Sequence, residues 1–231
     1  MSKEEQIQNL LSDFVRNAAD LIGGLSAEKM VSESAINPIL AKALGFKDFE
    51  SLARFYVYQR VGRSLVTSFG MKMENLVKLV SDGDKGEWWD VVKKSTNKNY
   101  YMSVKSGPRD MNKDQTVEFS RRARDIMKSD KKAFPFIAMG YGKKAWPVIT
   151  DTLRKEGMAP EKHAIVGKDL YEMLSGEKGY HLKLLRLVVN AGLDAIGGKT
   201  IVSLIDEKVN EISNAFSRRY ETLDSLLEDT F

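Results

Sequence analysis

The sequence contains no cysteine, only two histidines and five prolines among its 231 residues. Without cysteine, disulfides, zinc–thiolate sites and cysteine nucleophiles are excluded, and we expect a reducing, cytoplasmic compartment. No run of 18 or more apolar residues occurs, which predicts that no segment spans a membrane. The first residues, MSKEEQIQNL, are polar and lack the apolar core of a signal peptide, so no export signal is expected there.

The scarcity of histidine and of glycine-rich loops argues against histidine-based catalytic or metal sites and against nucleotide-binding loops. A histidine-based metal site or a Ser-His-Asp triad would depend on His163 and His181, and packing is the better interpretation of both. The phosphate-binding patterns GxxxxGK[ST] and GxGxxG are absent. The run Gly197-Gly198-Lys199-Thr200 ends like a P-loop but lacks the earlier glycine, so it is interpreted as a helix stop followed by a cap.

Charge is unevenly distributed along a chain of otherwise ordinary globular composition. Residues 93–144 contain 14 basic and 5 acidic side chains, a net charge of +9, whereas the remainder carries −5. This concentration of positive charge in one segment indicates a polyanionic partner. The alternative is a solvated basic face that binds nothing. We expect a single domain over residues 1–231, with a helical arm at 1–65, a core at 66–190 and a C-terminal helical segment at 191–231.

Helical periodicity dominates both ends of the chain. The apolar spacing predicts a first helix that ends at Gly23-Gly24, one or two short helices before Gly45, and two more helices separated by Gly70. Near the C-terminus, apolar residues at intervals of three and four predict one long helix from about Thr200 to Leu227.

The middle of the chain changes character. EWWDVVKK and NYYMSVKS are rich in aromatic and β-branched residues and predict an antiparallel hairpin. A helix capped by Asp110 or Asn112 follows, then a buried strand in AFPFIAMGYG, a helix, and a short strand in KHAIV that begins at His163. This order predicts an α/β domain with a small mixed sheet.

Lys105 stands at the end of the predicted second strand, directly before the turn Ser106-Gly107-Pro108. The two-residue period of a strand puts Ser103 and Lys105 on one face, and cross-strand pairing brings Asp90, on the first strand, to that face. An acid beside a lysine at a sheet edge can hold a divalent cation and order a water. Metal-assisted phosphodiester hydrolysis needs this arrangement.

These residues carry a resemblance to a known group of enzymes. Asp90…Ser103-Val104-Lys105 resembles the metal-binding and catalytic motif of the PD-(D/E)XK nuclease superfamily, and SVKSGPRDMNKDQ is similar to a segment of type II restriction endonucleases. The resemblance covers about residues 65–190. It implies a restriction-endonuclease-like αβββαβ core flanked by helical arms, Mg²⁺ as cofactor, Asp90 as metal ligand, and Lys105 as the residue that positions and activates the attacking water.

One position departs from the motif. The superfamily usually has Asp or Glu where this chain has Ser103, and a hydroxyl is a poorer ligand for Mg²⁺ than a carboxylate. Glu74, on the helix before the hairpin, is the candidate replacement, because related nucleases often carry a glutamate there. The alternative for Glu74 is an exposed helical glutamate. The backbone carbonyl of Val104 is a further candidate ligand.

Other polar residues near this segment are expected to hold DNA phosphates without reading sequence. The candidates are Ser106, Arg109, Asn112, Lys113, Gln115, Arg121, Lys143 and Lys144. The alternative for each is a solvated side chain. Of the adjacent Trp88 and Trp89, one is expected to point inward, and core packing is favoured over base stacking for both.

The resemblance implies a type II restriction endonuclease that cuts double-stranded DNA, with a cognate methyltransferase as functional partner. A homodimer is expected, because cutting both strands of a short symmetric site calls for two active sites related by a twofold axis. Two alternatives remain: a repair or recombination nuclease of the same superfamily that reads DNA structure, and a non-catalytic DNA-binding module, to which Ser103 gives support.

Overall fold

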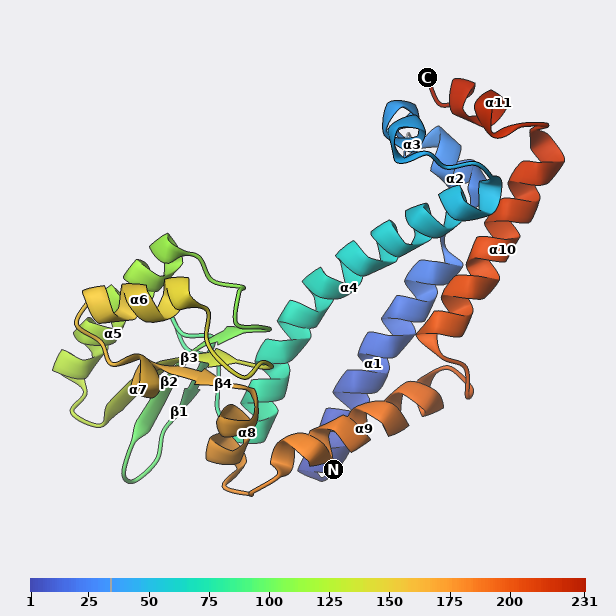
Figure 1. Cartoon of the computed structure of the whole chain (residues 1–231). Coiled ribbons are helices and arrows are strands. Elements are labelled where there is room, and N and C mark those ends of the chain that lie inside the picture. The colour runs from blue at the N-terminus through green and yellow to red at the C-terminus, as the bar shows by residue number, and fades with distance from the viewer. Residues whose placement is uncertain (34) are drawn as a thin grey trace. The chain divides into compact units, whose positions relative to one another are not determined.

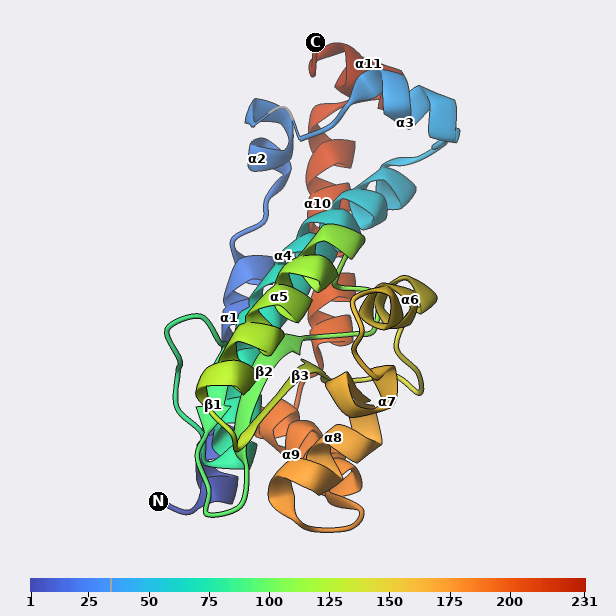
Figure 2. The same ribbon diagram turned by 90° about the vertical axis from the view of Figure 1, so that its left-hand side faces the viewer.

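A computed structural model of the chain describes residues 1–33 and 35–231. The chain divides into two compact units, one formed by Met1–Leu11 and Phe69–Asn190 and the other by Ser12–Ser68 and Ala191–Phe231. The elements in chain order (Figures 1 and 2) are α1 (Lys3–Gly23), α2 (Ala27–Ser32), α3 (Pro38–Leu44), α4 (Phe49–Ser81), β1 (Val91–Lys93), β2 (Asn99–Lys105), α5 (Lys113–Ser129), β3 (Ala133–Met139), α6 (Pro147–Lys155), α7 (Pro160–His163), β4 (Ala164–Val166), α8 (Gly167–Ser175), α9 (Tyr180–Ala195), α10 (Ile201–Arg219) and α11 (Leu223–Glu228).

The first unit is built on a four-stranded sheet in the order β1-β2-β3-β4. β1 is antiparallel to β2, whereas β2, β3 and β4 run parallel, so the predicted α/β class and small mixed sheet are confirmed. Before α5 the described residues contain two strands and one isolated antiparallel bridge, between Asp84 and Val92. The expected run of three strands before this helix is therefore present as two strands and a bridge.

The parallel part of the sheet is covered by α5 and α6, which lie on the same side of it (Figure 1). α5 begins at a capping box, in which Asn112 and Gln115 each accept a hydrogen bond from the other's backbone N–H. This confirms Asn112 as the cap. The helix buries side chains at spacings of three and four: Thr116, Phe119, Ser120 and Ala123. These residues pack α5 against the sheet and fix which of its side chains face β2.

The alternation along β2 decides what faces α5. Met102 and Val104 are buried, whereas Ser103 and Lys105 are half-buried and point to the opposite face. Ser103 pairs in parallel register with Ile137, which belongs to the apolar core beneath α5 and α6. Ser103 and Lys105 therefore lie on one face, as predicted, and that face is the one covered by α5.

α4 is a single helix of 33 residues, so the predicted break at Gly70 is wrong. One glycine in a helix costs only about 1 kcal/mol relative to alanine, and helix formation is cooperative. Beyond Gly70 the helix buries a stripe that holds it in place: Met73, Leu76, Val77 and Val80.

Three other predicted boundaries differ from the structure. The first strand begins at Val91, because the Gly86 N–H donates to the Trp89 carbonyl (3.0 Å) and folds the preceding residues into a bend. His163 ends α7, and β4 begins one residue later. The long C-terminal helix is divided at Tyr220, since Thr222 caps α11 through a second capping box.

The second unit contains only helices among its described residues. Its core joins α10 to the first half of α4 and to α2, α3 and α11, through residues such as Met30, Ala41, Val57, Val209 and Leu226. A salt bridge of 2.8 Å between Arg54 and Asp206 lies beside this core. Across the described residues of both units, no helix is long and apolar enough to cross a membrane.

Candidate active site

Asp90 lies in the bend directly before β1 rather than on the strand. Because Val91 pairs with Met102, the chain delivers Asp90 beside the next residues of β2. Its carboxylate Oδ2 accepts a hydrogen bond of 2.7 Å from the Val104 N–H and lies 3.5 Å from the Ser103 hydroxyl, which donates to it. The structure thus brings Asp90 to Ser103 and Val104, as the sequence predicts. It does so from the bend before β1, whereas the sequence placed Asp90 on the strand itself.

The edge of β2 is open where Asp90 meets it. The last paired residue of β1 on this side is Val91, so Val104 has no strand partner there. In a strand, the N–H and the C=O of one residue point to the same side. The Val104 carbonyl therefore points to the side on which Asp90 accepts the N–H, where a backbone ligand was predicted.

Glu74 approaches the same site from α4. It is half-buried, and this burial raises the pKa of its carboxyl; the negative charge of Asp90 raises it further, whereas Lys105 and Lys85 lower it. Asp90 and Lys105 therefore both lie within electrostatic range of Glu74. Three residues chosen from separate parts of the sequence are brought together.

Carboxylate and carbonyl oxygens are the kind of donor that a divalent cation takes. Glu74 and Asp90 repel each other, and a cation between two carboxylates offsets the repulsion that raises the Glu74 pKa. No group of three His, Asp or Glu residues in the described part of the chain is arranged to hold a metal ion. Together, α4 and the edge of β2 supply two carboxylates, from Glu74 and Asp90, and the Val104 carbonyl.

Ser103 and Lys105 also line a pocket of about 180 Å³ beneath α5. Gln115, Glu118 and Arg122 enter it from one face of that helix. Its other lining residues are Trp88, Trp89, Met111 and Phe119. Glu118 was not singled out from the sequence. The signal that could have identified Glu118 is its spacing on the helix after Lys105. It lies three residues after Gln115 and four before Arg122, so the three side chains share one helix face.

Glu118 is held by two arginines in this structure. Its carboxylate accepts hydrogen bonds from Arg121 at 2.8 and 3.0 Å and from Arg122 at 2.6 Å. The hydrogen bonds from Arg121 and Arg122 lower the pKa of Glu118 to about 2. The carboxylate is therefore ionised throughout the physiological pH range.

The turn after Lys105 is fastened to the loop after β3. The carbonyls of Lys105 and Ser106 accept the N–H groups of Gly140 (2.9 Å) and Tyr141 (3.1 Å). The Gly107 N–H donates to the Asp110 carboxylate at 2.6 Å. These bonds fix the backbone around Lys105 and set the two loops side by side.

The predicted phosphate-binding residues fall into two groups. Arg109, Lys113, Lys143 and Lys144 are exposed, and none of the four has an ion pair within the described structure. Asn112 and Gln115 use their side-chain oxygens in the capping box, and Arg121 is paired with Glu118 and with Asp125 (3.5 Å). Ser106 lies in the turn and is half-buried.

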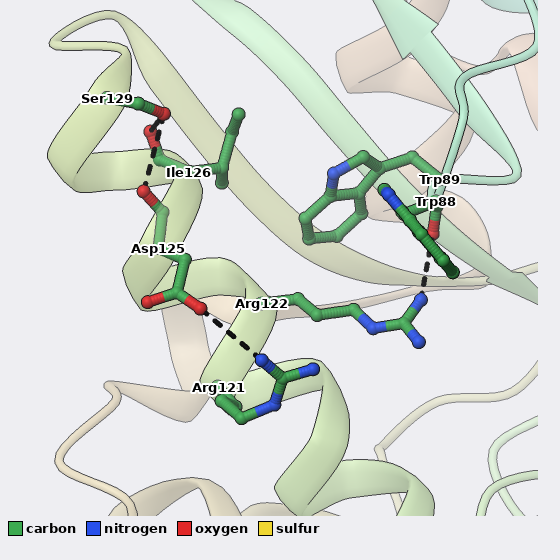
Figure 3. Close-up of a pocket in the computed structure, with 7 residues that line it drawn as sticks. All are labelled: Trp88, Trp89, Arg121, Arg122, Asp125, Ile126 and Ser129. Carbon is green, nitrogen blue, oxygen red and sulfur yellow. Dashed lines mark hydrogen bonds and ion pairs between the residues drawn. The ribbon is translucent and has the colours of Figure 1, made fainter.

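Trp89 packs inward, as predicted for one of the two tryptophans, but Trp88 does not face the opposite side, because both side chains line the same pockets. Trp89 packs against Tyr101 and Phe119, with ring centroids 5.6 and 5.9 Å away. Trp88 is 66% exposed, so the prediction of core packing is wrong for it. The Arg122 guanidinium lies 4.9 Å from the Trp88 ring centroid, on one side of a pocket of about 420 Å³ (Figure 3).

Both histidines lie outside this site. His163 Nδ1 is 2.6 Å from the Pro135 carbonyl, and its ring stacks on Phe134. His181 Nδ1 lies 3.7 Å from Glu172. The packing interpretation of His163 is confirmed.

Comparison with known proteins agrees with this arrangement. No curated protein matches the chain significantly. The sequence model of one family, described as type II restriction endonuclease EcoO109I, matches residues 2–192. The match includes the sheet, α5, and all of Glu74, Asp90, Ser103 and Lys105. Because it covers most of the chain and the whole of the assembled site, the protein belongs to the EcoO109I family of type II restriction endonucleases.

Proposed function

We propose that the protein hydrolyses phosphodiester bonds of double-stranded DNA at a specific sequence, with Mg²⁺ as cofactor. Membership of a restriction endonuclease family makes DNA the substrate. The observation that carries the finer proposal is the hydrogen bond between the Asp90 carboxylate and the Val104 N–H, which fixes one acid at the open strand edge beside Glu74 and Lys105. The αβββαβ core of the superfamily is part of this proposal, with α4, the bridge between Asp84 and Val92, β1, β2, α5 and β3 as its counterparts.

The roles of the site residues follow from their positions. Asp90, Glu74 and the Val104 carbonyl would hold the metal, since Mg²⁺ prefers charged and carbonyl oxygens. When bound, Mg²⁺ would stabilise negative charge on the phosphate and increase the acidity of water. Lys105, on the face covered by α5, orients the attacking water and helps to remove its proton.

Exposed cations around the turn would hold the DNA backbone. The Pro108 carbonyl accepts the Trp146 N–H at 3.3 Å, so the loop that carries Lys143 and Lys144 lies against the turn after Lys105. Arg109 lies in the same turn and is exposed. These cations can neutralise phosphates on either side of the scissile bond.

DNA affinity should therefore fall steeply with salt. Each phosphate neutralised by Lys or Arg contributes about −0.9 to the slope of log K against log salt concentration. The double substitution Lys143→Ala/Lys144→Ala should make this slope shallower by up to about 1.8, measured by fluorescence anisotropy with Ca²⁺ in place of Mg²⁺. Lys199→Ala, outside the basic segment, serves as control and should leave the slope unchanged. A nearly flat slope for the wild type would remove this segment as the DNA face.

Glu74→Gln should sharply reduce cleavage. The amide keeps the size and hydrogen bonding of the side chain but removes one of two carboxylates at the strand edge. We expect the rate to fall by about 10- to 100-fold and the Mg²⁺ concentration for half-maximal rate to rise. The measurement is cleavage rate against Mg²⁺ concentration, with Glu87→Gln, an exposed glutamate of the same unit, as control. If Glu74→Gln and Glu87→Gln show the same cleavage rate and the same Mg²⁺ requirement, Glu74 is a surface residue of the helix and not a metal ligand.

Digestion of a sequenced plasmid with Mg²⁺, followed by mapping of the ends, tests the function as a whole. Discrete bands establish sequence specificity, whereas a smear or a preference for branched DNA favours a repair or recombination nuclease. Absence of any Mg²⁺-dependent nicking would favour the non-catalytic module. We further propose a homodimer, which analytical ultracentrifugation checks, and a cognate methyltransferase that protects the recognised sequence.

A further inference from the structure

The bend before β1 holds a tryptophan ring in solvent. Trp88 is 66% exposed, whereas tryptophan side chains are on average largely buried. The bend depends on Gly86, whose N–H donates to the Trp89 carbonyl at 3.0 Å. A Cβ at Gly86 would lie 2.7 Å from the side chain of Val92, so another residue there would force the bend to shift. The exposure of Trp88 is therefore built into the backbone.

Arg122 holds the exposed ring from one side. Its guanidinium lies 4.9 Å from the Trp88 ring centroid, a cation–π contact, and its Nη1 donates to the Trp88 carbonyl at 3.5 Å. Its Nε donates to Glu118 at 2.6 Å, which fixes the arginine to α5. Because the ring remains 66% exposed with this contact in place, its other face is open. Trp88 thus offers a flat aromatic surface in a fixed orientation.

The open face of Trp88 lines the pocket of about 420 Å³. This volume lies within the range of about 300–1,000 Å³ that is typical of small-ligand sites. Figure 3 shows the two tryptophans on one side of the pocket, and Ile126 and Ser129 of α5 on the other. Two indole rings and a half-buried isoleucine favour a flat, largely apolar ring as occupant. A nucleobase has this shape, and any base can stack on an aromatic side chain.

The arginines and the position of the pocket select a nucleotide over other flat ligands. Arg121 and Arg122 both line it, and their side chains are 58% and 35% exposed. A guanidinium has five N–H donors, so the two hydrogen bonds that Arg122 makes in the described structure leave others for a phosphate. Trp88, Trp89 and Arg122 also line the pocket of Lys105. The two pockets therefore adjoin, and neighbouring nucleotides of one strand can occupy both.

We propose that the pocket of Trp88 binds an unpaired nucleobase of DNA, stacked on the open face of Trp88, while Arg121 and Arg122 bind the adjoining phosphate. A base in a duplex reaches such a pocket only by leaving its stack, which costs least where it is mispaired or unpaired. The inference rests on the proposed cleavage of DNA. It adds a contact to a base, next to the scissile phosphate, to the contacts with phosphates described above.

Two single strands with the same phosphates test the site: a labelled oligo-thymidylate and an abasic strand of equal length. Fluorescence anisotropy in EDTA measures binding without cleavage. Wild type should bind the thymidylate roughly 5- to 100-fold more tightly, the range expected for stacking of one base on an aromatic side chain. Trp88→Ala should lose most of this preference but bind the abasic strand like wild type, since the arginines remain. Trp88→Phe keeps an aromatic face and should retain much of the preference.

Two further variants separate the pocket from a general effect on the protein. Ile126→Trp places a larger ring in the pocket and should remove the preference while Trp88 is still present. Tyr58→Ala removes an aromatic side chain that is 46% exposed but does not line the pocket, and it should keep the wild-type preference. Acrylamide quenching of Trp88, taken as the difference between wild type and Trp88→Phe, should decrease when thymidylate is added and not when the abasic strand is added.

A duplex arm identifies the source of the base. A duplex with one unpaired thymidine is compared with the same duplex carrying an abasic residue at that place. A preference for the thymidine that depends on Trp88 shows that the pocket accepts a base from a duplex. A preference seen only with the single strands assigns the pocket to unwound DNA.

The outcomes distinguish this inference from the proposed function. If wild type binds the thymidylate and the abasic strand equally, or if Trp88→Ala keeps the wild-type preference, the base site is overturned, and plasmid digestion with Mg²⁺ decides the function separately. If the preference depends on Trp88 but the plasmid is not cleaved, the base site stands and the proposed cleavage fails.

Discussion

Lys105→Ala is expected to lower the rate of DNA cleavage by about 10²- to 10⁴-fold, the range typical of a positioned acid–base group. The side chain lies at the end of β2, on the face covered by α5, and lines the pocket with Ser103. The backbone bond from the Gly140 N–H to the Lys105 carbonyl does not involve the side chain, so alanine preserves the strand and the turn. The fold and most of the DNA affinity should therefore remain.

Two measurements distinguish this role from a phosphate contact. Single-turnover cleavage reports the chemical step, and a mobility-shift assay with Ca²⁺ reports DNA binding. Lys128→Ala, a 79% exposed lysine of α5, is the matched control and should alter neither by more than a few fold. If Lys105→Ala cuts at near wild-type rate, or loses DNA binding and cleavage in equal measure, the lysine does not act on the water.

The parts of the site set by local chemistry were predictable from the sequence. Strand alternation placed Ser103 and Lys105 on one face, and the amide pair Asn112 and Gln115 marked the start of α5. Both features depend on residues close in sequence. The turn at Gly107 is likewise local, since its N–H is capped by Asp110 three residues later.

Features that depend on tertiary packing were not predictable in the same way. Gly70 resembles a helix stop, but α4 continues beyond it because the residues that follow bury an apolar stripe. Trp88 resembles a core residue, but the bend at Gly86 exposes it to Arg122. Glu118 resembles one more charge on a solvated helix. Only the docking of α5 on the sheet, through Phe119 and its neighbours, shows that it enters the pocket of Lys105.

Asp90→Asn is expected to abolish most cleavage while preserving the fold. The asparagine carbonyl can still accept the Val104 N–H, so the bend before β1 keeps its anchor. What is lost is a negative charge at the open strand edge. We expect a fall in rate of at least about 10²-fold and a higher Mg²⁺ requirement, measured by plasmid cleavage across a Mg²⁺ titration. Asp84→Asn, an acid that is 93% exposed, is the control.

Asp90→Ala separates anchoring from charge. Alanine leaves the half-buried Val104 N–H without its acceptor, which should cost about 1 kcal/mol in the free energy of unfolding, whereas asparagine should cost little. The asparagine variant has a further signature in the metal-free protein. The charge of Asp90 raises the pKa of Glu74, so its removal should shift the NMR titration of Glu74 to lower pH, leaving the effects of burial and of Lys105 and Lys85. If the Glu74 titration does not move, the two carboxylates are too far apart to share a cation, and the site must be built around Asp90 with other partners.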